Sequence, residues 1–275
     1  MWISCQSIGA VTRFGLGYDP GADYTEPPRG DLALPPFDAR EELGRKGFGM
    51  LDRSAVLGLL AARDCLTGRA TDPDGTGVTV GTTLGGFEAT ADFASRPLRE
   101  AKPYDIPPLR FPTAVMNFTA GQIAIRHRLR GANTTIAGGE AAGLTALSYL
   151  TTLFAAGMVD SSLLVVAEEL SPHRLAACAP AARPACAEAA TAFLLVPGSV
   201  DDRLFRMRVT PPDPLPHPGS HIDIDSCRKT FGNTGAAVFG CQLLMARSML
   251  RADATPTVAI APASPVATPG CEVAW

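Results

Sequence analysis

Short apolar segments rich in β-branched residues alternate along the chain with longer segments of helical periodicity. Residues 3–11 predict a first strand, and the Gly- and Pro-rich stretch 17–36 predicts a surface loop. After Asp52, which can cap a helix, apolar residues recur at helical spacing as far as Leu66. Further strands are predicted at residues 77–83, 134–137, 163–167 and 192–196, and an apolar helix at 141–158. This alternation predicts an α/β fold with a largely parallel sheet.

The last quarter of the chain has a different pattern. A strand is predicted at residues 204–209, followed by a loop with five prolines between positions 211 and 218. Residues 235–250 predict a helix that is apolar almost all round, which is typical of a core helix covered on several sides. Two short apolar pieces, 258–261 and 273–275, end the sequence.

Composition narrows the function classes. The 275 residues are 46% apolar and 19% charged, which indicates a well-buried globular chain. Lys and Arg (24) nearly balance Asp and Glu (27) without a basic block, so nucleic acid is not an expected partner. No apolar run is long enough for a membrane span and the first residues do not form a signal peptide, so we expect a cytoplasmic protein. Seven cysteines without a C-x-x-C motif, and four scattered histidines, predict neither a disulfide framework nor a metal site, and no cofactor is expected.

One segment carries a family resemblance. Residues 131–147 read Gly-Ala-Asn-Thr-Thr-Ile-Ala-Gly-Gly-Glu-Ala-Ala-Gly-Leu-Thr-Ala-Leu, and this segment resembles the strand and central helix of the β-ketoacyl-ACP synthases. Further motifs follow the family's order, at residues 45–66, 77–86, 111–117, 157–169 and 229–237. The last of these, from Lys229, resembles the family's K-x-x-x-G-H loop. The resemblance implies an α/β, thiolase-like fold layered α-β-α-β-α, packed as one domain, with a complete N-terminal half (1–200) and a shortened C-terminal half (201–275).

The positions that carry the family's chemistry differ here. The resemblance puts Glu140 where the nucleophilic cysteine stands, at the start of the central helix, and Asn233 where the G-H histidine stands. The histidine of the family's H-G-T loop has no counterpart, because His217 lies in the proline loop and too close to Lys229. Three other thiols lack a capping turn or lie inside an apolar helix, and we expect them to be inert: Cys178, Cys186 and Cys241. The resemblance therefore implies no catalytic residue.

Glu140 and Asn233 each have two interpretations. Glu140 can cap the helix and fill the old cysteine site, paired with an Arg or a Lys. Alternatively, a Glu140 kept neutral by burial could help to decarboxylate malonyl units, whereas an ionised carboxylate would repel the developing enolate. Asn233 is either a buried amide that satisfies a loop or a donor to a thioester carbonyl.

A ketosynthase-like chain without catalytic residues resembles the chain-length factors, the inactive partners of active ketosynthases. In that family the strand before the nucleophile pairs across the dimer, which implies an interface at Thr134, Thr135, Ile136 and Ala137. The preceding segment lines the partner's acyl tunnel, and its counterparts are Leu109, Phe111, Met116 and Phe118, with ordinary packing as the alternative for each. A basic face for an acidic acyl carrier protein is expected at Arg126, Arg128 and Arg130.

The short ketosynthase-like subunits of aryl-polyene pigment biosynthesis resemble this chain most. The sequence thus predicts a protein that is not an enzyme by itself and that shapes the acyl tunnel of a full-length β-ketoacyl-ACP synthase in a heterodimer or higher hetero-oligomer. The alternatives are a malonyl-ACP decarboxylase that uses Glu140, or a free-standing acyl- or carrier-protein-binding scaffold.

Overall fold

A single mixed sheet organises the molecule. The computed structural model describes residues 1–28, 30, 32–44, 49, 51–102, 104–201, 203–210, 221–252, 257–260 and 270–274. Nine strands in these ranges form one sheet in the order β3-β2-β4-β5-β1-β6-β9-β8-β7. The strands are β1 (Ile3–Val11), β2 (Thr76–Thr82), β3 (Asn133–Ala137), β4 (Ser161–Glu168), β5 (Ala189–Pro197), β6 (Phe205–Thr210), β7 (His221–Ile222), β8 (Thr257–Ile260) and β9 (Gly270–Ala274).

Helices connect these strands. The α-helices are α1 (Ala39–Leu43), α2 (Arg53–Leu66), α3 (Phe87–Arg99), α4 (Phe118–His127), α5 (Ala142–Ala155), α6 (Pro172–Ala177), α7 (Ile224–Phe231) and α8 (Val238–Ala252). Short 3-10 helices are η2 (Pro108–Ala114), η3 (Gly139–Ala141), η4 (Pro180–Ala185) and η5 (Gly235–Ala237). The predicted α/β class is confirmed, and β1 has the bounds that the apolar pattern predicted.

The prediction of a largely parallel sheet is wrong. Among the described strands, β2 pairs in parallel with β3 and β4, and β7 with β8, whereas the five other pairings are antiparallel. The reason lies between β4 and β5, where α6 and η4 form no crossover and the chain returns beside the strand it has just left. Apolar periodicity indicates a buried strand but not its direction.

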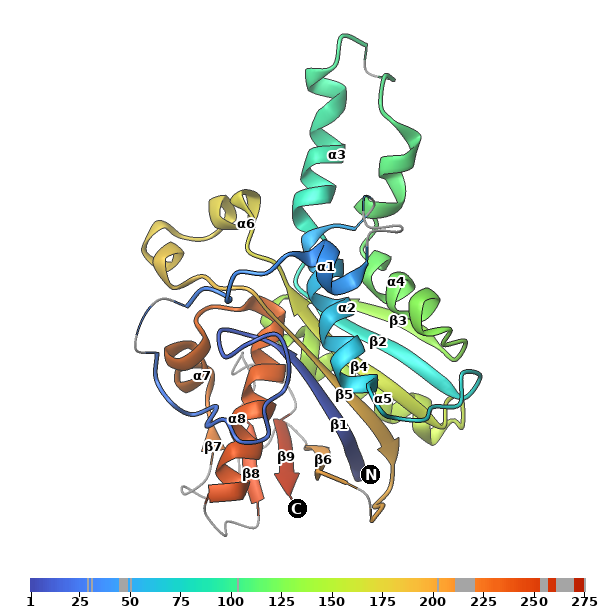
Figure 1. The fold of residues 1–275 in the computed structure, drawn as a ribbon, viewed down its shortest axis with the longest axis vertical. Helices are drawn as coiled ribbons and strands as arrows, with labels where there is room; N and C mark the ends of the chain where they lie inside the picture. Colours follow the sequence, from blue (N-terminus) through green and yellow to red (C-terminus); the bar gives the residue numbers. More distant parts are fainter. Residues whose placement is uncertain are drawn as a thin grey trace.

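Helices cover both faces of the sheet (Figure 1). On one face α2 and α4 pack against β2, β4 and β5, and on the other face α5 and α8 close a second hydrophobic cluster. The side chain of Asp52 caps α2 as predicted, accepting a hydrogen bond from the Ala55 N–H at 2.6 Å. The predicted core helix is α8, where every residue from Val238 to Ala246 is buried.

The segment after residue 200 extends the same sheet. β6 pairs antiparallel with β1, with Ile3 opposite Met207, and β9 pairs with β6. The predicted proline loop, His217 included, lies outside the described residues. Among the described helices, none is long and apolar enough to cross a membrane.

One part of the chain leaves the body of the molecule. The helix α3 and the segment that returns through η2 project together as an arm, defined here as residues 87–102 and 104–116 (Figure 1). No side chain of α3 is buried, and the ring contact between Phe93 and Phe111, with centroids 5.9 Å apart, joins its two sides. The arm carries exposed apolar side chains, among them Leu98 at 87% exposed.

Candidate functional site

The two positions that the family resemblance aligns with catalytic residues lie in neighbouring turns. Glu140 is in η3, the turn between the edge strand β3 and the long helix α5. Asn233 follows α7 and precedes η5, the turn that leads into α8, and η3 packs against η5. The fold therefore brings together two residues that are 93 positions apart in the sequence (233 minus 140).

Glu140 is bound by a cation from α7. Its Oε1 accepts a hydrogen bond from Arg228 Nη2 at 2.5 Å, in an ion pair whose side chains are 28% and 38% exposed. Asp225 gives Arg228 a second, longer contact at 3.4 Å. Glu140 thus has the basic partner that the first interpretation required. The helical cap of that interpretation is not present, because no side chain caps η3 or α5.

Arg228 is a site residue that the sequence analysis passed over. In the motif K-x-x-x-G-H the basic residue precedes the histidine by five positions, and five positions before Asn233 stands Arg228. Lys229, from which the motif was counted, is exposed. The spacing of the motif was therefore a signal that could have identified Arg228.

Backbone hydrogen bonds hold Asn233. Its N–H donates to the Ala185 carbonyl at 2.6 Å, and its carbonyl accepts from the Ala187 N–H at 3.0 Å. Its side-chain Oδ1 accepts from the Gly235 N–H at 3.2 Å. An amide oxygen committed to the adjoining turn matches the interpretation in which Asn233 satisfies a loop.

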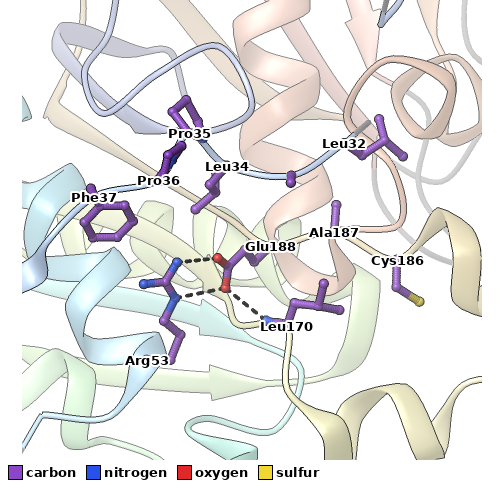
Figure 2. A pocket seen from close by; sticks show the side chains of 11 residues that line it. Leu32, Leu34, Pro35, Pro36, Phe37, Arg53, Leu170, Cys186, Ala187 and Glu188 are labelled. Atoms are coloured by element: carbon purple, nitrogen blue, oxygen red, sulfur yellow. Dashed lines mark hydrogen bonds and ion pairs between the residues drawn. The ribbon is translucent and has the colours of Figure 1, made fainter. Parts of the chain in front are cut away.

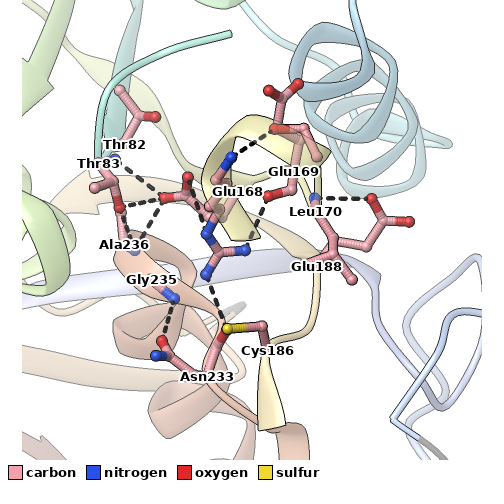
Figure 3. Close-up of polar contacts among 12 residues, drawn as sticks. Thr82, Thr83, Glu168, Glu169, Leu170, Cys186, Glu188, Asn233, Gly235 and Ala236 are labelled. Atoms are coloured by element: carbon pink, nitrogen blue, oxygen red, sulfur yellow. Dashed lines mark hydrogen bonds and ion pairs between the residues drawn. The ribbon is translucent and has the colours of Figure 1, made fainter. Parts of the chain in front are cut away.

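Beneath these turns lies a buried carboxylate, Glu168, at the end of β4 (Figure 3). Its Oε2 accepts from the backbone N–H groups of Thr83 at 3.1 Å and Ala236 at 3.2 Å, and from the Thr83 hydroxyl. Gly235 closes the turn at a φ of 55°, where an added Cβ would come within 2.8 Å of this oxygen. Burial raises the pKa of Glu168, and the charge of Arg174 opposes that shift.

Arg174 on α6 joins three segments at this point. The buried guanidinium donates to the carbonyls of Glu169 and Ala187, both at 2.8 Å, and to that of Asn233 at 2.9 Å. Its Nε lies 3.9 Å from Glu168 Oε1. Because its donors bind main-chain carbonyls, Arg174 fixes the backbone around Asn233 and offers little to a ligand.

Two further carboxylates lie at the base of the arm, Glu169, which is buried, and Asp52, which is half-buried. Glu169 accepts the Glu88 N–H at 2.7 Å at the start of α3, and burial raises its pKa to about 7. Burial also raises the pKa of Asp52 to about 6, and the negative charge of Asp52 contributes to the shift of Glu169. One oxygen of each, Asp52 Oδ2 and Glu169 Oε2, has no hydrogen-bond partner among the residues that the structure describes. Burying these carboxyl groups costs free energy, and the hydrogen bond to Glu169 links the start of the arm to the body of the molecule.

Figure 2 shows a cleft of about 460 Å³ with Cys186 and Ala187 on its wall. Cys186 pairs with Asn233 through the backbone, which brings the cleft close to that turn. The residues that line the cleft come from four stretches of the chain: Leu32, Ala33, Leu34, Pro35, Pro36 and Phe37; Arg53; Leu170; and Cys186, Ala187 and Glu188. Glu188 Oε2 accepts from Arg53 Nε at 3.1 Å and from the Leu170 N–H at 3.2 Å. The polar groups of this mostly apolar cleft are therefore already paired with each other.

The described residues hold no group of three His, Cys, Asp or Glu side chains that could bind a metal.

A model of the family "Beta-ketoacyl synthase, N-terminal domain" matches residues 37–192, more than half of the chain. The chain belongs to the β-ketoacyl synthase family. It is 30% identical over 168 residues to 3-oxoacyl-[acyl-carrier-protein] synthase 2 of Rhizobium meliloti (strain 1021). That match covers 59% of this chain and 39% of the relative's length.

Solved structures show the same thiolase-like ketosynthase fold. The ishigamide ketosynthase/chain length factor matches with a TM-score of 0.77 at 23% identity, over 99% of this chain and 98% of that one. The ketosynthase ApeO in complex with its chain length factor ApeC, from Xenorhabdus doucetiae, matches with a TM-score of 0.69 at 16% identity, over the whole of both chains. The fold predicted from the sequence motifs is thus confirmed.

The four tunnel candidates of this β-ketoacyl synthase chain separate into two groups. Leu109, Phe111 and Met116 lie along the returning side of the arm and are 73%, 57% and 53% exposed. Phe118 is buried at the start of α4. Three of the four side chains are therefore exposed on the arm, and the fourth, Phe118, is buried in the body of the molecule.

The predicted interface strand is the edge of the ketosynthase sheet. Thr134, Thr135, Ile136 and Ala137 belong to β3, which pairs in parallel with β2 on one side and is the last strand in the sheet on the other. None of the four side chains is fully buried. An edge strand leaves main-chain groups available for pairing with another chain.

The predicted basic face is partly neutralised within the chain. Arg130 forms an ion pair with Asp74, and Arg126 donates to the Leu43 carbonyl at 3.2 Å. Arg128 ends α4 in the left-handed conformation, at a φ of 58°, and its side chain is exposed. Of the three arginines, Arg128 has the most freedom to meet an acidic partner.

Proposed function

We propose that this chain is a non-catalytic, chain-length-factor-like subunit that pairs with an active β-ketoacyl-ACP synthase and shapes its acyl tunnel. The setting would be polyketide or polyene biosynthesis of the aryl-polyene type, in the cytoplasm, with an acyl carrier protein as second partner. The observation that carries the proposal is the ion pair of Glu140 with Arg228, at the position where the family has its nucleophile.

Glu140 and its ion pair with Arg228 argue against two kinds of catalysis by the chain itself. Acyl transfer in the family passes through a thioester on a cysteine, and a carboxylate cannot form one. The decarboxylase alternative requires a neutral carboxyl group, but the guanidinium of Arg228 gives Glu140 a counter-charge at 2.5 Å. Both chemistries are therefore disfavoured at Glu140 by its immediate surroundings.

The exposed arm and the edge strand support a protein partner. Monomeric proteins rarely leave several large apolar side chains exposed on one projecting element. Here Leu98, Leu109 and Phe111 are each more than half exposed on the arm, and β3 leaves a sheet edge open. A partner ketosynthase that pairs with β3 and receives the arm would cover both features.

Co-expression tests the proposal. The chain is expressed with a ketosynthase that keeps its Cys-His-His set, and co-purification and product formation from malonyl-ACP are measured. We expect a stable complex and product only when both chains are present. A stable monomer that ignores such a ketosynthase would contradict the proposal.

The Glu140→Ala variant separates a partner subunit from an enzyme. A non-catalytic Glu140 predicts product formation within about threefold of the parent complex, because an exposed ion pair contributes little to stability. A decarboxylase predicts instead that the chain alone releases CO₂ from malonyl-ACP and that Glu140→Ala abolishes the release. The second result would overturn the proposal.

The arm is tested by two matched substitutions. Phe111→Ser removes a large apolar side chain from the arm, whereas Met158→Ser removes one that is 62% exposed between α5 and β4. We expect Phe111→Ser to weaken the complex by about tenfold or more and Met158→Ser to weaken it by less than about twofold. Equal effects of the two variants would exclude the arm as the binding element.

Carrier-protein binding is tested separately. Arg128→Glu should lower the affinity for an acyl carrier protein more than Arg130→Glu does, because Asp74 already neutralises Arg130. Unchanged affinity after reversal of the charge at Arg126, Arg128 and Arg130 together would remove this surface from the proposal.

A further inference from the structure

Two cysteines outside the altered catalytic positions lie next to each other. Cys178 follows α6 and Cys186 follows η4, and their Sγ atoms are 3.5 Å apart. All seven cysteines are free thiols, and the sequence predicted that Cys178 and Cys186 are inert. That prediction considered each thiol alone as a nucleophile, whereas the fold places the two as a pair.

The pair lies near the surface. Cys178 is half-buried, and Cys186 is 7% exposed on the wall of the cleft beside Leu170. The stretch between them, η4, is largely exposed. Burial raises the pKa of Cys186, whereas the charges of Arg174 and Arg183 lower it. A small oxidant can reach Cys178 first, and Cys186 is in position to react with the product.

We propose that Cys178 and Cys186 form an oxidation site that a hydroperoxide converts into an intrachain disulfide. The Cys178 thiolate attacks one peroxide oxygen, the O–O bond breaks, and water or an alcohol leaves, so that Cys178 becomes a sulfenic acid. The Cys186 thiolate then attacks the sulfenic sulfur, and the S–O bond breaks as the S–S bond forms. The departing hydroxide takes up a proton and leaves as water, so the two thiol protons end in this water and in the water or alcohol of the first step. Two thiols lose two electrons in total, and one peroxide is reduced.

The geometry suits this reaction. A disulfide requires the sulfur atoms to approach to about 2.0 Å, roughly 1.5 Å closer than in the reduced protein. The nine-residue segment that the bond would close includes the exposed η4, which can supply that movement. Among the described residues, the Cys186 thiol also contacts the Ala182 carbonyl of the same segment, at 3.4 Å. The backbone on either side of Cys186 is hydrogen-bonded to Asn233, so we expect the Cys178 side of the segment to supply most of the movement.

The bond would act on the backbone around Asn233. Cys186 bridges to Asn233, with hydrogen bonds from the N–H of Asn233 to Ala185 and from the N–H of Ala187 to Asn233. An oxidised pair would fix the segment from α6 to η4 against this turn and against the wall of the cleft. This inference is independent of the proposed partner function, since it rests on the two thiols and their neighbours.

The chain contains its own control pair. Cys227 on α7 and Cys241 on α8 are also neighbouring thiols, but both are completely buried. Like Cys178 and Cys186, these two thiols lie next to each other in the fold, but solvent and a small oxidant cannot reach them. If proximity and access together make the site, a hydroperoxide should distinguish the two pairs in the native protein.

The experiment treats the reduced, full-length protein, with its partner if one is needed for solubility, with one equivalent of hydrogen peroxide. Remaining thiols are then alkylated under denaturing conditions and the cysteines are mapped by mass spectrometry. We expect the thiol count to fall from seven to five, with Cys178 linked to Cys186 and with Cys227 and Cys241 both alkylated. Separate sulfinic acids, another pairing, or seven thiols after treatment would overturn the proposal.

Two variants complete the test. Cys178→Ser, at a half-buried position, should leave Cys186 alkylated after peroxide treatment, and Cys186→Ser should leave Cys178 as a sulfenic acid that dimedone traps. Phenylarsine oxide, which chelates adjacent dithiols, should protect both cysteines from alkylation in the reduced parent and in neither variant. If phenylarsine oxide does not protect Cys178 and Cys186 in the folded parent, that result would also contradict the proposed oxidation site.

Discussion

The centre of the sheet and the arm contain similar aromatic pairs in opposite surroundings. Phe193 on β5 meets Phe205 on β6 with ring centroids 6.5 Å apart, and both side chains are completely buried. Phe93 on α3 meets Phe111 on η2 at 5.9 Å, but Phe111 is 57% exposed. The contact between the rings is comparable, and only the cover around it differs.

The difference shows which apolar side chains the isolated chain buries by itself and which it leaves exposed. Helices cover both faces of the sheet's centre, whereas the arm is a single helix and a returning segment that other described elements contact near its base, where Phe87 of α3 meets His173 of α6. Burial of apolar surface contributes about 25 cal/mol per Å², and the arm leaves much of that contribution unrealised in the isolated chain. The buried centre of the sheet therefore contributes much more to the stability of the isolated chain than the exposed arm does.

The largest effect is expected at the centre of the sheet. Phe193→Ala should lower the free energy of unfolding by about 3–5 kcal/mol, because it leaves a cavity among side chains that cannot collapse. Phe193→Leu, which keeps most of the volume, should cost less than about half of that. Urea unfolding measures both, and equal costs would show that the site is not close-packed.

The base of the arm should make stability depend on pH. The pKa of Glu169 is about 7 in the folded protein, above the ordinary value of 4.5, so the folded state binds a proton that the unfolded state has released at intermediate pH. Stability should therefore fall as pH rises from about 4.5 to about 7, by on the order of 2–3 kcal/mol for this group.

Glu169→Gln tests that dependence. The amide can still accept the Glu88 N–H, and it carries no charge to bury. We expect the variant to unfold later than the parent in urea at pH 8 and to differ little from it at pH 4.5. Glu41→Gln, at an exposed position on α1, is the matched control, and an equally flattened pH profile in both variants would refute the assignment.

The ion pair of Glu140 with Arg228 should affect the free energy of unfolding less than Phe193 or Glu169 does. Its partners are 28% and 38% exposed, and pairs of this kind contribute about 0–1 kcal/mol. Glu140→Ala and Arg228→Ala should each lower the free energy of unfolding by less than about 1 kcal/mol, with a coupling energy in the double-mutant cycle below about 1 kcal/mol. A larger coupling would mean that the pair is far more desolvated than the structure indicates.

The smallest effect is expected on the arm. Leu98 is 87% exposed, so Leu98→Ser should change the free energy of unfolding of the isolated chain by less than about 0.5 kcal/mol. Thermal and urea unfolding of the chain without a ketosynthase measure this. A cost as large as that of a core substitution would show that the arm folds back onto the body in solution, and the contrast with the sheet would fail.

Apolar pattern predicted the buried part of the fold well. Strand β1, helix α2 with its Asp52 cap, and the core helix α8 were all predicted, because buried elements need apolar residues at a fixed period. The arm was not predicted. No element was predicted over residues 87–99, although α3 is amphipathic, and none of its side chains is buried.

The sequence pointed to Glu140 and Asn233 but not to the side chains that contact them. Glu140 and Asn233 were identified from family motifs, and each was left with two interpretations. Arg228, Arg174 and Glu168 were not assigned roles, although they supply the cation for Glu140 and the support for the Asn233 turn. These contacts join segments more than 50 residues apart, and no local pattern specifies which distant side chains meet.

The sequence by itself determined the β-ketoacyl synthase family and most of the buried strands and helices. These are properties of residue identity and of short-range periodicity. Only the tertiary structure decided the direction of the strands, the exposure of the arm, the counter-charge of Glu140 and the proximity of Cys178 to Cys186. Each of those depends on how distant segments pack, and packing is selected by the free energy of the whole core rather than by any one segment.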